Sequence, residues 1–215
     1  MSEELQGQRI AILAADGVER IELEQPRGAL HGVGAQTEVL SIHDGEIEAR
    51  QHDLEPAATF PVDKVVSQAS VADYDALVLP GGAVNPDKLR MDGDAVAFVK
   101  AFADSGKPIA AICHAPWTLL EAGVVRGRRL TSWPSIRTDL RNAGAEVVDE
   151  EVVIDGQLTT SRSPADLQAF CPAIIQQFAA ARQPAHACGR ERAGIDGWYA
   201  TRLKHLCSRL ASALG

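Results

Sequence analysis

Four short apolar runs, separated by segments with helical patterns, constrain the fold of this chain more than any other feature. They are RIAILAA (residues 9–15), TEVLSI (37–42), DALVLPGG (75–82) and KPIAAI (107–112). The runs are rich in Ile, Leu, Val and Ala without the polar alternation of a half-exposed strand, so we expect strands covered on both faces. Strands that alternate with helices form parallel sheets through βαβ units. The sequence therefore predicts a three-layer α/β/α sandwich with a mostly parallel sheet.

The segments between and after these runs have the spacing and end signals of helices. Ser163 is the expected N-cap of a final core helix, with Pro164 at its first position. Several of the predicted helices earlier in the chain end at a glycine. The predicted helices cover residues 19–34, 93–106, 115–123, 135–144 and 163–181.

Two further segments predict β-structure at the edges of the sheet. Between Asp44 and Val71 the pattern weakens into EIEARQ and TFPVDKVV, which favour a hairpin or edge strands. The later run AEVVDEEVVIDGQLTTS contains Asp155-Gly156, a turn dipeptide typical of a hairpin.

The chain divides into a predicted domain, residues 1–183, and a C-terminal extension, residues 184–215. From Pro184 the composition becomes that of a linker, followed by an amphipathic helix whose leucines recur every three or four residues. That helix either packs on the domain or a partner subunit, or has a binding role of its own.

Charge and composition exclude several classes of partner. The 29 acidic and 21 basic side chains give a formal net charge of −8, which disfavours nucleic acid. Acidic residues precede the first apolar run, and no apolar stretch has the length of a membrane span, so we expect a soluble, cytoplasmic protein with no membrane partner. The four cysteines form no CxxC pair, which favours free thiols. We expect neither a metal nor another cofactor, since no HxxxH or clustered carboxylate-histidine spacing occurs.

Cys113 stands between the apolar run 107–112 and a predicted helix that begins with Pro116. A sulfur at a helix N-terminus meets unpaired N–H groups, which favour the thiolate. Ala111 and Ala115 supply the small flanking residues that a nucleophile elbow needs. A buried cysteine can equally fill a core.

Other groups are expected at the same sheet edge. Gly81 and Gly82 follow a strand and leave their N–H groups uncovered. Glu19, Glu22 and Glu24 come just after the first strand, where one of them could reach the thiolate. The ring of His114, adjacent in sequence to Cys113, is poorly placed to reach the sulfur without backbone distortion, but its N–H could donate to an oxyanion.

Five motifs together resemble the PfpI family of intracellular peptidases and deglycases. They are ADGVERIEL, DALVLPGG, GKPIAAICHAP, GRRLTSWPSIRTDLRNAGAEVVDEEVVIDG and LTTSRSPADL, and the resemblance runs from about Arg9 to Arg182. It implies a flavodoxin-like domain of the class I glutamine amidotransferase-like superfamily, with a nucleophile elbow after a central strand.

The resemblance also implies roles for individual residues. Cys113 becomes the nucleophile, Glu19 the carboxylic acid that hydrogen-bonds the sulfur, and the N–H groups of Gly82 and His114 the oxyanion donors. In the peptidase branch a neighbouring subunit lends an acid to His114. Asp87 stands at that position in PGGAVNPDKLR, where aspartate is one methylene shorter than the family's glutamate and the loop carries an extra residue. Trp117 departs from the family pattern, and with Trp133 it either lines the pocket or belongs to the core.

Three functions follow as expectations. The first is a cysteine-dependent stress-response hydrolase acting on glycated protein or small reactive carbonyl adducts, with Glu19 or His114 moving protons. The second is a peptidase that uses Cys113, His114 and an Asp87 contributed by another subunit of a homo-oligomer, a dimer or larger. The third is a non-catalytic redox sensor or holdase chaperone.

Overall fold

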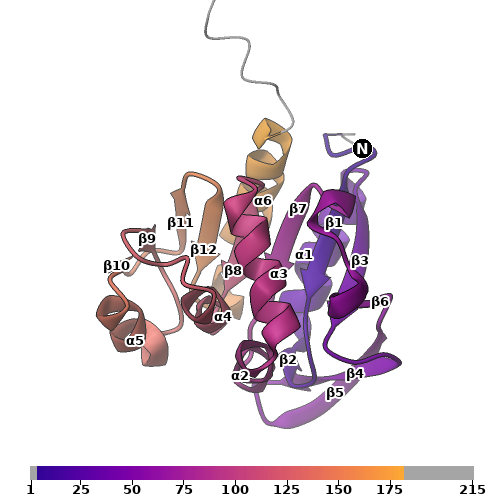
Figure 1. Cartoon of the computed structure of the whole chain (residues 1–215), viewed down its shortest axis with the longest axis horizontal. Coiled ribbons are helices and arrows are strands. Elements are labelled where there is room, and N and C mark those ends of the chain that lie inside the picture. Colours follow the sequence, from indigo (N-terminus) through magenta and orange to yellow (C-terminus); the bar gives the residue numbers. More distant parts are fainter. Residues whose placement is uncertain (1–3, 182–215) are drawn as a thin grey trace, which may run out of the picture. The chain divides into compact units, whose positions relative to one another are not determined.

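A mostly parallel sheet forms the centre of the molecule. The structure is a computed structural model, and it describes residues 4–181 (Figure 1). In this part of the chain a seven-stranded sheet has the order β11-β12-β8-β7-β1-β3-β6, and only the pairing of β11 with β12 is antiparallel. The strands are β1 Arg9–Leu13, β3 Gln36–Ser41, β6 Lys64–Val65, β7 Ala76–Leu79, β8 Ile109–Ile112, β11 Val152–Asp155 and β12 Leu158–Ser161.

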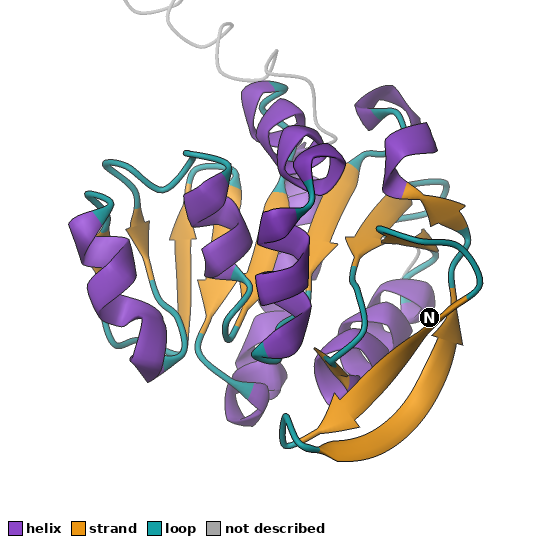
Figure 2. Ribbon diagram, turned by 60° about the horizontal axis from the view of Figure 1, so that its bottom comes forward, coloured by secondary structure: helices purple, strands orange, loops and turns teal. Residues whose placement is uncertain are grey.

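Helices cover both faces of this sheet, and the predicted three-layer α/β/α fold is confirmed (Figure 2). Because successive residues of a strand point to opposite faces, each strand feeds two cores. Ile10 and Ile12 of β1 share one core with Leu23 of α1. Ala11 and Leu13 share the other with the aromatic residues of α3. The helices are α1 Arg20–Gly32, α2 Val84–Met91, α3 Gly93–Asp104, α4 Pro116–Glu121, α5 Arg137–Asn142 and α6 Leu167–Ala181.

Two helices differ from the prediction. The sequence pattern predicts a loop where α2 forms, because the first turn of α2 contains Asn85 and Pro86, which favour turns. The last helix begins at Leu167, three residues after Pro164, its predicted first position, since a 3₁₀ turn, Pro164–Asp166, precedes it. The side chain of Ser163 makes no capping hydrogen bond at that turn.

Both predicted hairpins are present. Strands β4 Glu46–Gln51 and β5 Glu55–Pro61 are antiparallel and form a separate three-stranded sheet with β2 Val18–Glu19. Figure 1 shows this hairpin beside β2 and α2. The second hairpin, β11–β12, lies at the edge of the main sheet and turns through Gly156 and Gln157, one residue later than the predicted Asp155-Gly156 turn, since Asp155 still pairs with Leu158. The start of the predicted hairpin segment AEVVDEEVVIDGQLTTS does not join this hairpin. Instead, β10 Glu146–Val147 pairs in parallel with β9 Arg129–Leu130.

Some expectations concern parts of the chain that the structure leaves undescribed. The C-terminal extension, residues 184–215, with Cys188 and Cys207, lies outside the described residues, so the predicted division into two parts stays a prediction. Cys113 and Cys171 are free and buried. None of the helices between residues 4 and 181 combines the length and the apolar character that crossing a membrane requires.

Asn85 connects the turn after β7 to the end of β1. Its side chain is fully buried. Its Nδ2 donates to the carbonyl oxygens of Pro80 at 2.8 Å and Gly81 at 3.1 Å, and its Oδ1 accepts from the amide of Ala15 at 2.7 Å. A single side chain therefore satisfies three backbone groups and fixes the Gly81-Gly82 turn relative to the neighbouring strand.

Replacing Asn85 should destabilise the protein strongly. Asn85→Ala leaves a buried amide and two carbonyl groups without this partner, so we expect the free energy of unfolding to fall by about 3 kcal/mol. Urea unfolding followed by circular dichroism measures the change. The exposed Asn142→Ala is the control and should stay within about 0.5 kcal/mol of the parent protein. Equal stability of the two variants would contradict the structural role of Asn85.

Candidate active site

Cys113 occupies a strained turn between β8 and α4. Its φ is 63°, in the left-handed region that a residue with a side chain rarely adopts. Two backbone hydrogen bonds hold it there, from its own amide to the Ser161 carbonyl at 3.1 Å and from the Trp133 amide to its carbonyl at 2.9 Å. The flanking Ala111 and Ala115 are buried, as a tight elbow requires.

This backbone conformation brings the His114 ring to the sulfur. Nδ1 of His114 lies 3.2 Å from Sγ of Cys113. The sequence analysis expected no such contact without distortion, and the positive φ of Cys113 is that distortion. On its other side, Nε2 lies 3.2 Å from Oγ of Ser135, and the ring stacks on Trp133 with centroids 5.6 Å apart. The ring is therefore held in one orientation.

The carboxyl group against the sulfur belongs to Glu22, which corrects the expectation of Glu19. Glu22 is fully buried, its Oε2 accepts from the amide of Gly81 at 2.9 Å, and its carboxyl group lies beside the thiol of Cys113, on whose ionisation it acts. Glu19 lies at the N-cap of α1, and its Oε2 accepts from the Asp53 amide at 3.2 Å. The two residues differ because Glu19 is still in extended conformation, as the last residue of β2 beside β4, whereas Glu22 lies inside α1.

The buried carboxyl and thiol disfavour each other's ionisation. Burial raises the pKa of Glu22 to about 8, and the nearby charge of Glu19 also raises it. Burial raises the pKa of Cys113 as well, and a Glu22 carboxylate raises it further, while hydrogen bonds from the Gly82 and His114 amides lower it. Desolvation outweighs the helix N-terminus that the sequence analysis expected to favour the thiolate. At pH 7 both groups therefore hold their protons.

His114 is the group able to take the proton of the thiol. Burial lowers its pKa, partly offset by the negative charge of Asp53. A neutral imidazole with Nε2–H directed at Ser135 presents an unprotonated Nδ1 to Sγ. The geometry thus supplies a base on one side of the sulfur and a protonated acid on the other.

Gly81 and Gly82 leave room for this arrangement because neither carries a side chain. A Cβ on Gly81 would lie 2.7 Å from Cβ of Cys113 and from Oε2 of Glu22. A Cβ on Gly82, whose φ is 84°, would lie 2.6 Å from the carbonyl oxygen of Gly17. The close approach brings the Gly82 amide, like that of His114, within hydrogen-bonding reach of Cys113. These are the two predicted oxyanion donors, and their role stays a proposal.

A cavity of about 430 Å³ opens onto the sulfur. Its volume lies in the range of small-molecule sites. Trp133 is part of the lining, but Trp117 is not: it packs against the His114 ring, and its Nε1 donates to Asp139 at 2.9 Å. The lining residues are Glu19, Glu22, His52, Asp53, Gly82, Cys113, Trp133, Ser163, Pro164 and Ala165.

Comparisons with known proteins show the family to which the chain belongs. The model of the DJ-1/PfpI family matches residues 8–177. The chain belongs to the DJ-1/PfpI family. The resemblance to the PfpI family found in the sequence is thereby confirmed.

Named relatives cover most of the chain. "Deglycase TK1284" from Thermococcus kodakarensis is 41% identical over 168 residues, which are 78% of this chain and 98% of the relative. "Protein/nucleic acid deglycase 2" from Escherichia coli is 41% identical over 164 residues, which are 75% of this chain and 92% of the relative. Among solved structures, Drosophila melanogaster DJ-1beta superposes with a TM-score of 0.72 at 28% identity, over 83% of this chain and 91% of that one.

Asp87, which the family resemblance places near a neighbouring His114, lies on the exposed side of α2. Within residues 4–181 no hydrogen bond or ion pair joins it to His114. Its role across a subunit interface stays a prediction. Within the same described residues, no group of three or more His, Cys, Asp or Glu side chains is arranged to hold a metal ion.

The sequence analysis missed two segments of the cavity wall. One is the tip of the β4–β5 hairpin, with His52 and Asp53. Both residues have left-handed φ values, 53° and 65°, and Asp53 is held by Glu19 and Ala83, which are distant in the sequence, so no local pattern reveals these contacts.

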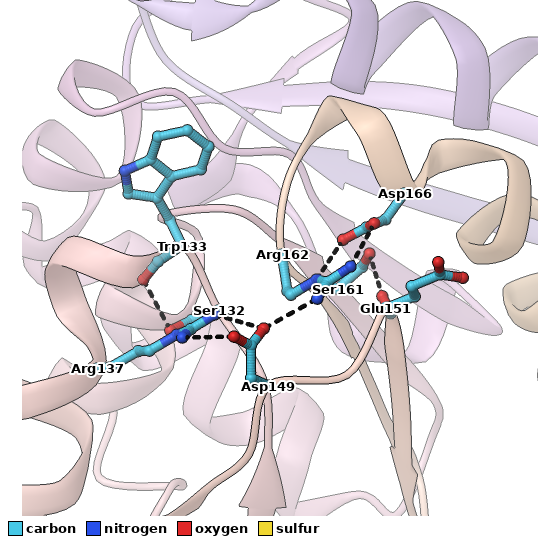
Figure 3. A network of polar contacts seen from close by, with 8 residues as sticks. All are labelled: Ser132, Trp133, Arg137, Asp149, Glu151, Ser161, Arg162 and Asp166. Atoms are coloured by element: carbon cyan, nitrogen blue, oxygen red, sulfur yellow. Dashed lines mark hydrogen bonds and ion pairs between the residues drawn. The ribbon is translucent and has the colours of Figure 1, made fainter.

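The other missed segment, Ser163 to Ala165, follows β12 and is held by ion pairs. Figure 3 shows Asp149 between Arg137 and Arg162, with Arg162 also paired with Asp166. Because Arg162 and Asp166 flank the segment, their two hydrogen bonds of 2.8 and 2.9 Å hold in place this segment, which leads into the 3₁₀ turn Pro164–Asp166. The motif RSPAD was visible in the sequence, but its position on the cavity was not.

The raised pKa of Glu22 predicts a specific pH dependence of stability. The unfolded chain releases this proton near the ordinary value of 4.5, whereas the folded protein keeps it until about pH 8. The contribution of Glu22 to stability therefore falls as pH rises through that window, by about 1.4 kcal/mol per pH unit. Glu22→Gln, which mimics the protonated acid, should lose this slope.

Urea unfolding of the parent protein and of Glu22→Gln at several pH values in that window measures the difference. Glu24→Gln is the matched control, because Glu24 is half-exposed on the same helix and pairs with Arg20. A constant difference in stability between the parent protein and Glu22→Gln across the window would contradict a protonated Glu22.

Proposed function

We propose that the protein is a cysteine-dependent hydrolase that removes early carbonyl adducts, such as those of methylglyoxal, from amines and thiols. The observation that carries the proposal is the placement of Cys113 between a base, His114, and a buried acid, Glu22, at a cavity of about 430 Å³. Relatives named deglycases at 41% identity support it. The first of the three expected functions is therefore retained, with Glu22 in place of Glu19.

The first step of the proposed reaction is a proton shift. In an early methylglyoxal adduct, a ketone lies next to a carbon that bears a hydroxyl group and the amine nitrogen. Moving the proton of that carbon to the ketone carbon, and the proton of the hydroxyl group to the ketone oxygen, converts the adduct into a lactoyl amide without any external oxidant. The unprotonated Nδ1 of His114 is the group placed to accept and return this proton, and the protonated Glu22 lies on the other side of the sulfur.

The second step is acyl transfer to the sulfur. His114 Nδ1 takes the Cys113 proton as Sγ attacks the acyl carbon, and the resulting oxyanion lies within reach of the Gly82 and His114 amides. Collapse of this intermediate breaks the carbon–nitrogen bond, and the leaving amine takes the proton from His114. Water then hydrolyses the thioester, which releases lactate and restores the thiol.

Each of the two alternative functions has a requirement that remains a proposal. A peptidase needs an acid on His114 from another subunit, while in this chain Nε2 of His114 already contacts Ser135. A redox sensor needs a Cys113 that is oxidised stoichiometrically without turnover. Lactate release separates the proposed hydrolase from both alternatives, because neither peptide-bond cleavage nor sulfur oxidation produces lactate.

Replacing the nucleophile should abolish turnover. A peptide pre-treated with methylglyoxal is incubated with the protein, and lactate and free amine are measured. Cys113→Ala should reduce both to the uncatalysed rate, because no acyl-enzyme can form. Cys171→Ala is the matched control, since Cys171 is a buried cysteine of α6 outside the cavity lining. Lactate release by Cys113→Ala at the parent rate would refute the proposal.

A further inference from the structure

The tip of the β4–β5 hairpin carries a carboxylate into the cavity. Asp53 has a φ of 65°, a conformation that Asp and Asn tolerate better than most residues. Its Oδ1 accepts from the amide of Ala83 at 2.7 Å, and its amide donates to Oε2 of Glu19 at 3.2 Å. These contacts fix Asp53 beside the Gly82 turn, although 30 residues separate Asp53 from Ala83.

The second oxygen of this carboxylate is available to a ligand. Oδ2 of Asp53 makes no hydrogen bond or ion pair with any residue between 4 and 181. The side chain is half-buried and lines the cavity. Its negative charge acts on both His114 and Cys113, which places it within electrostatic range of the reacting atoms.

The charge of the cavity is unbalanced. Asp53 and Glu19 both line it, and among the basic residue types only His52, with neither Lys nor Arg, belongs to the lining formed by the described residues. The other acid of the lining, Glu22, is held neutral at pH 7. A cavity with low-dielectric walls and net negative charge attracts cations and repels anions.

From these contacts we infer that Asp53 is a specificity-determining residue, whose free oxygen faces a cationic group of the substrate next to the reacting carbonyl. The inference rests on the proposed function for its substrate class, an adduct that carries an ammonium or guanidinium group. The negative charge of Asp53 repels adducts that carry a carboxylate, in place of the cationic group, next to the reacting carbonyl. Asp53 takes no part in bond making or breaking.

The charge selection can be measured without turnover. Two methanethiosulfonates, one with a trimethylammonioethyl group and one with a sulfonatoethyl group, modify thiols by the same disulfide exchange, in which Sγ displaces sulfinate. The rate at Cys113 is followed by mass spectrometry of its peptide, and the ratio of cationic to anionic rates is divided by the ratio for a free thiol. We expect this normalised ratio to be well above one in the parent protein.

Asp53→Asn is the decisive variant. Asparagine keeps the Oδ1 that accepts from Ala83 and tolerates the left-handed conformation, so only the charge is lost. We expect the normalised ratio to fall about tenfold, the size of one partly screened charge at this range. Glu55→Gln removes one charge from an exposed residue of the same hairpin and should keep the parent ratio.

Each other outcome overturns the inference. A parent ratio near one would show that the cavity does not select by charge. An equal change of both rates in Asp53→Asn would show a structural role, and the same fall in Glu55→Gln would show a general surface effect. Failure of the proposed function is a separate result, because absence of lactate release leaves this ratio measurable and would remove only the assigned substrate class.

Discussion

The contact between the buried carboxyl of Glu22 and the thiol of Cys113 is the interaction on which the rest of the site depends. Two acidic groups share a desolvated space, and the Gly81 amide anchors the carboxyl. Burying charge without a partner is costly, so both groups stay protonated until something removes a proton. The neutral His114 on the other side of the sulfur supplies that base. The Cys113 thiol is therefore protonated in the resting protein and ionises only as the reaction proceeds.

The fold provides the geometry for this contact at the ends of neighbouring parallel strands. Glu22 enters from the helix after β1, the glycine turn follows β7, and the elbow follows β8; these strands are adjacent in the sheet. Ligand sites of open α/β sheets lie at such carboxyl ends. The β4–β5 hairpin then adds a wall from outside the main sheet, which is how Asp53 reaches a site built by other elements.

Composition and spacing were sufficient to predict the four central strands β1, β3, β7 and β8, because apolar runs of this kind are stable only when covered on both faces. They also located Cys113 and the Gly81-Gly82 turn, which follow directly from strand ends. Choosing between Glu19 and Glu22 was beyond the sequence pattern, since both lie at the same sheet edge and only the orientation of α1 separates them. The helix α2 and the position of Asp53 depend on contacts between distant residues, such as Asn85 with Ala15, that no local pattern contains.

The most direct test of this account is the ionisation of Glu22 itself. Carbon-13 NMR of protein with labelled glutamate side chains, compared between the parent protein and Glu22→Gln, identifies its carboxyl signal. The account predicts one carboxyl that titrates near pH 8 and disappears in the variant. A Glu22 signal that titrates at the ordinary value of 4.5 would contradict it, because an ionised carboxylate would then face Cys113 throughout the neutral range.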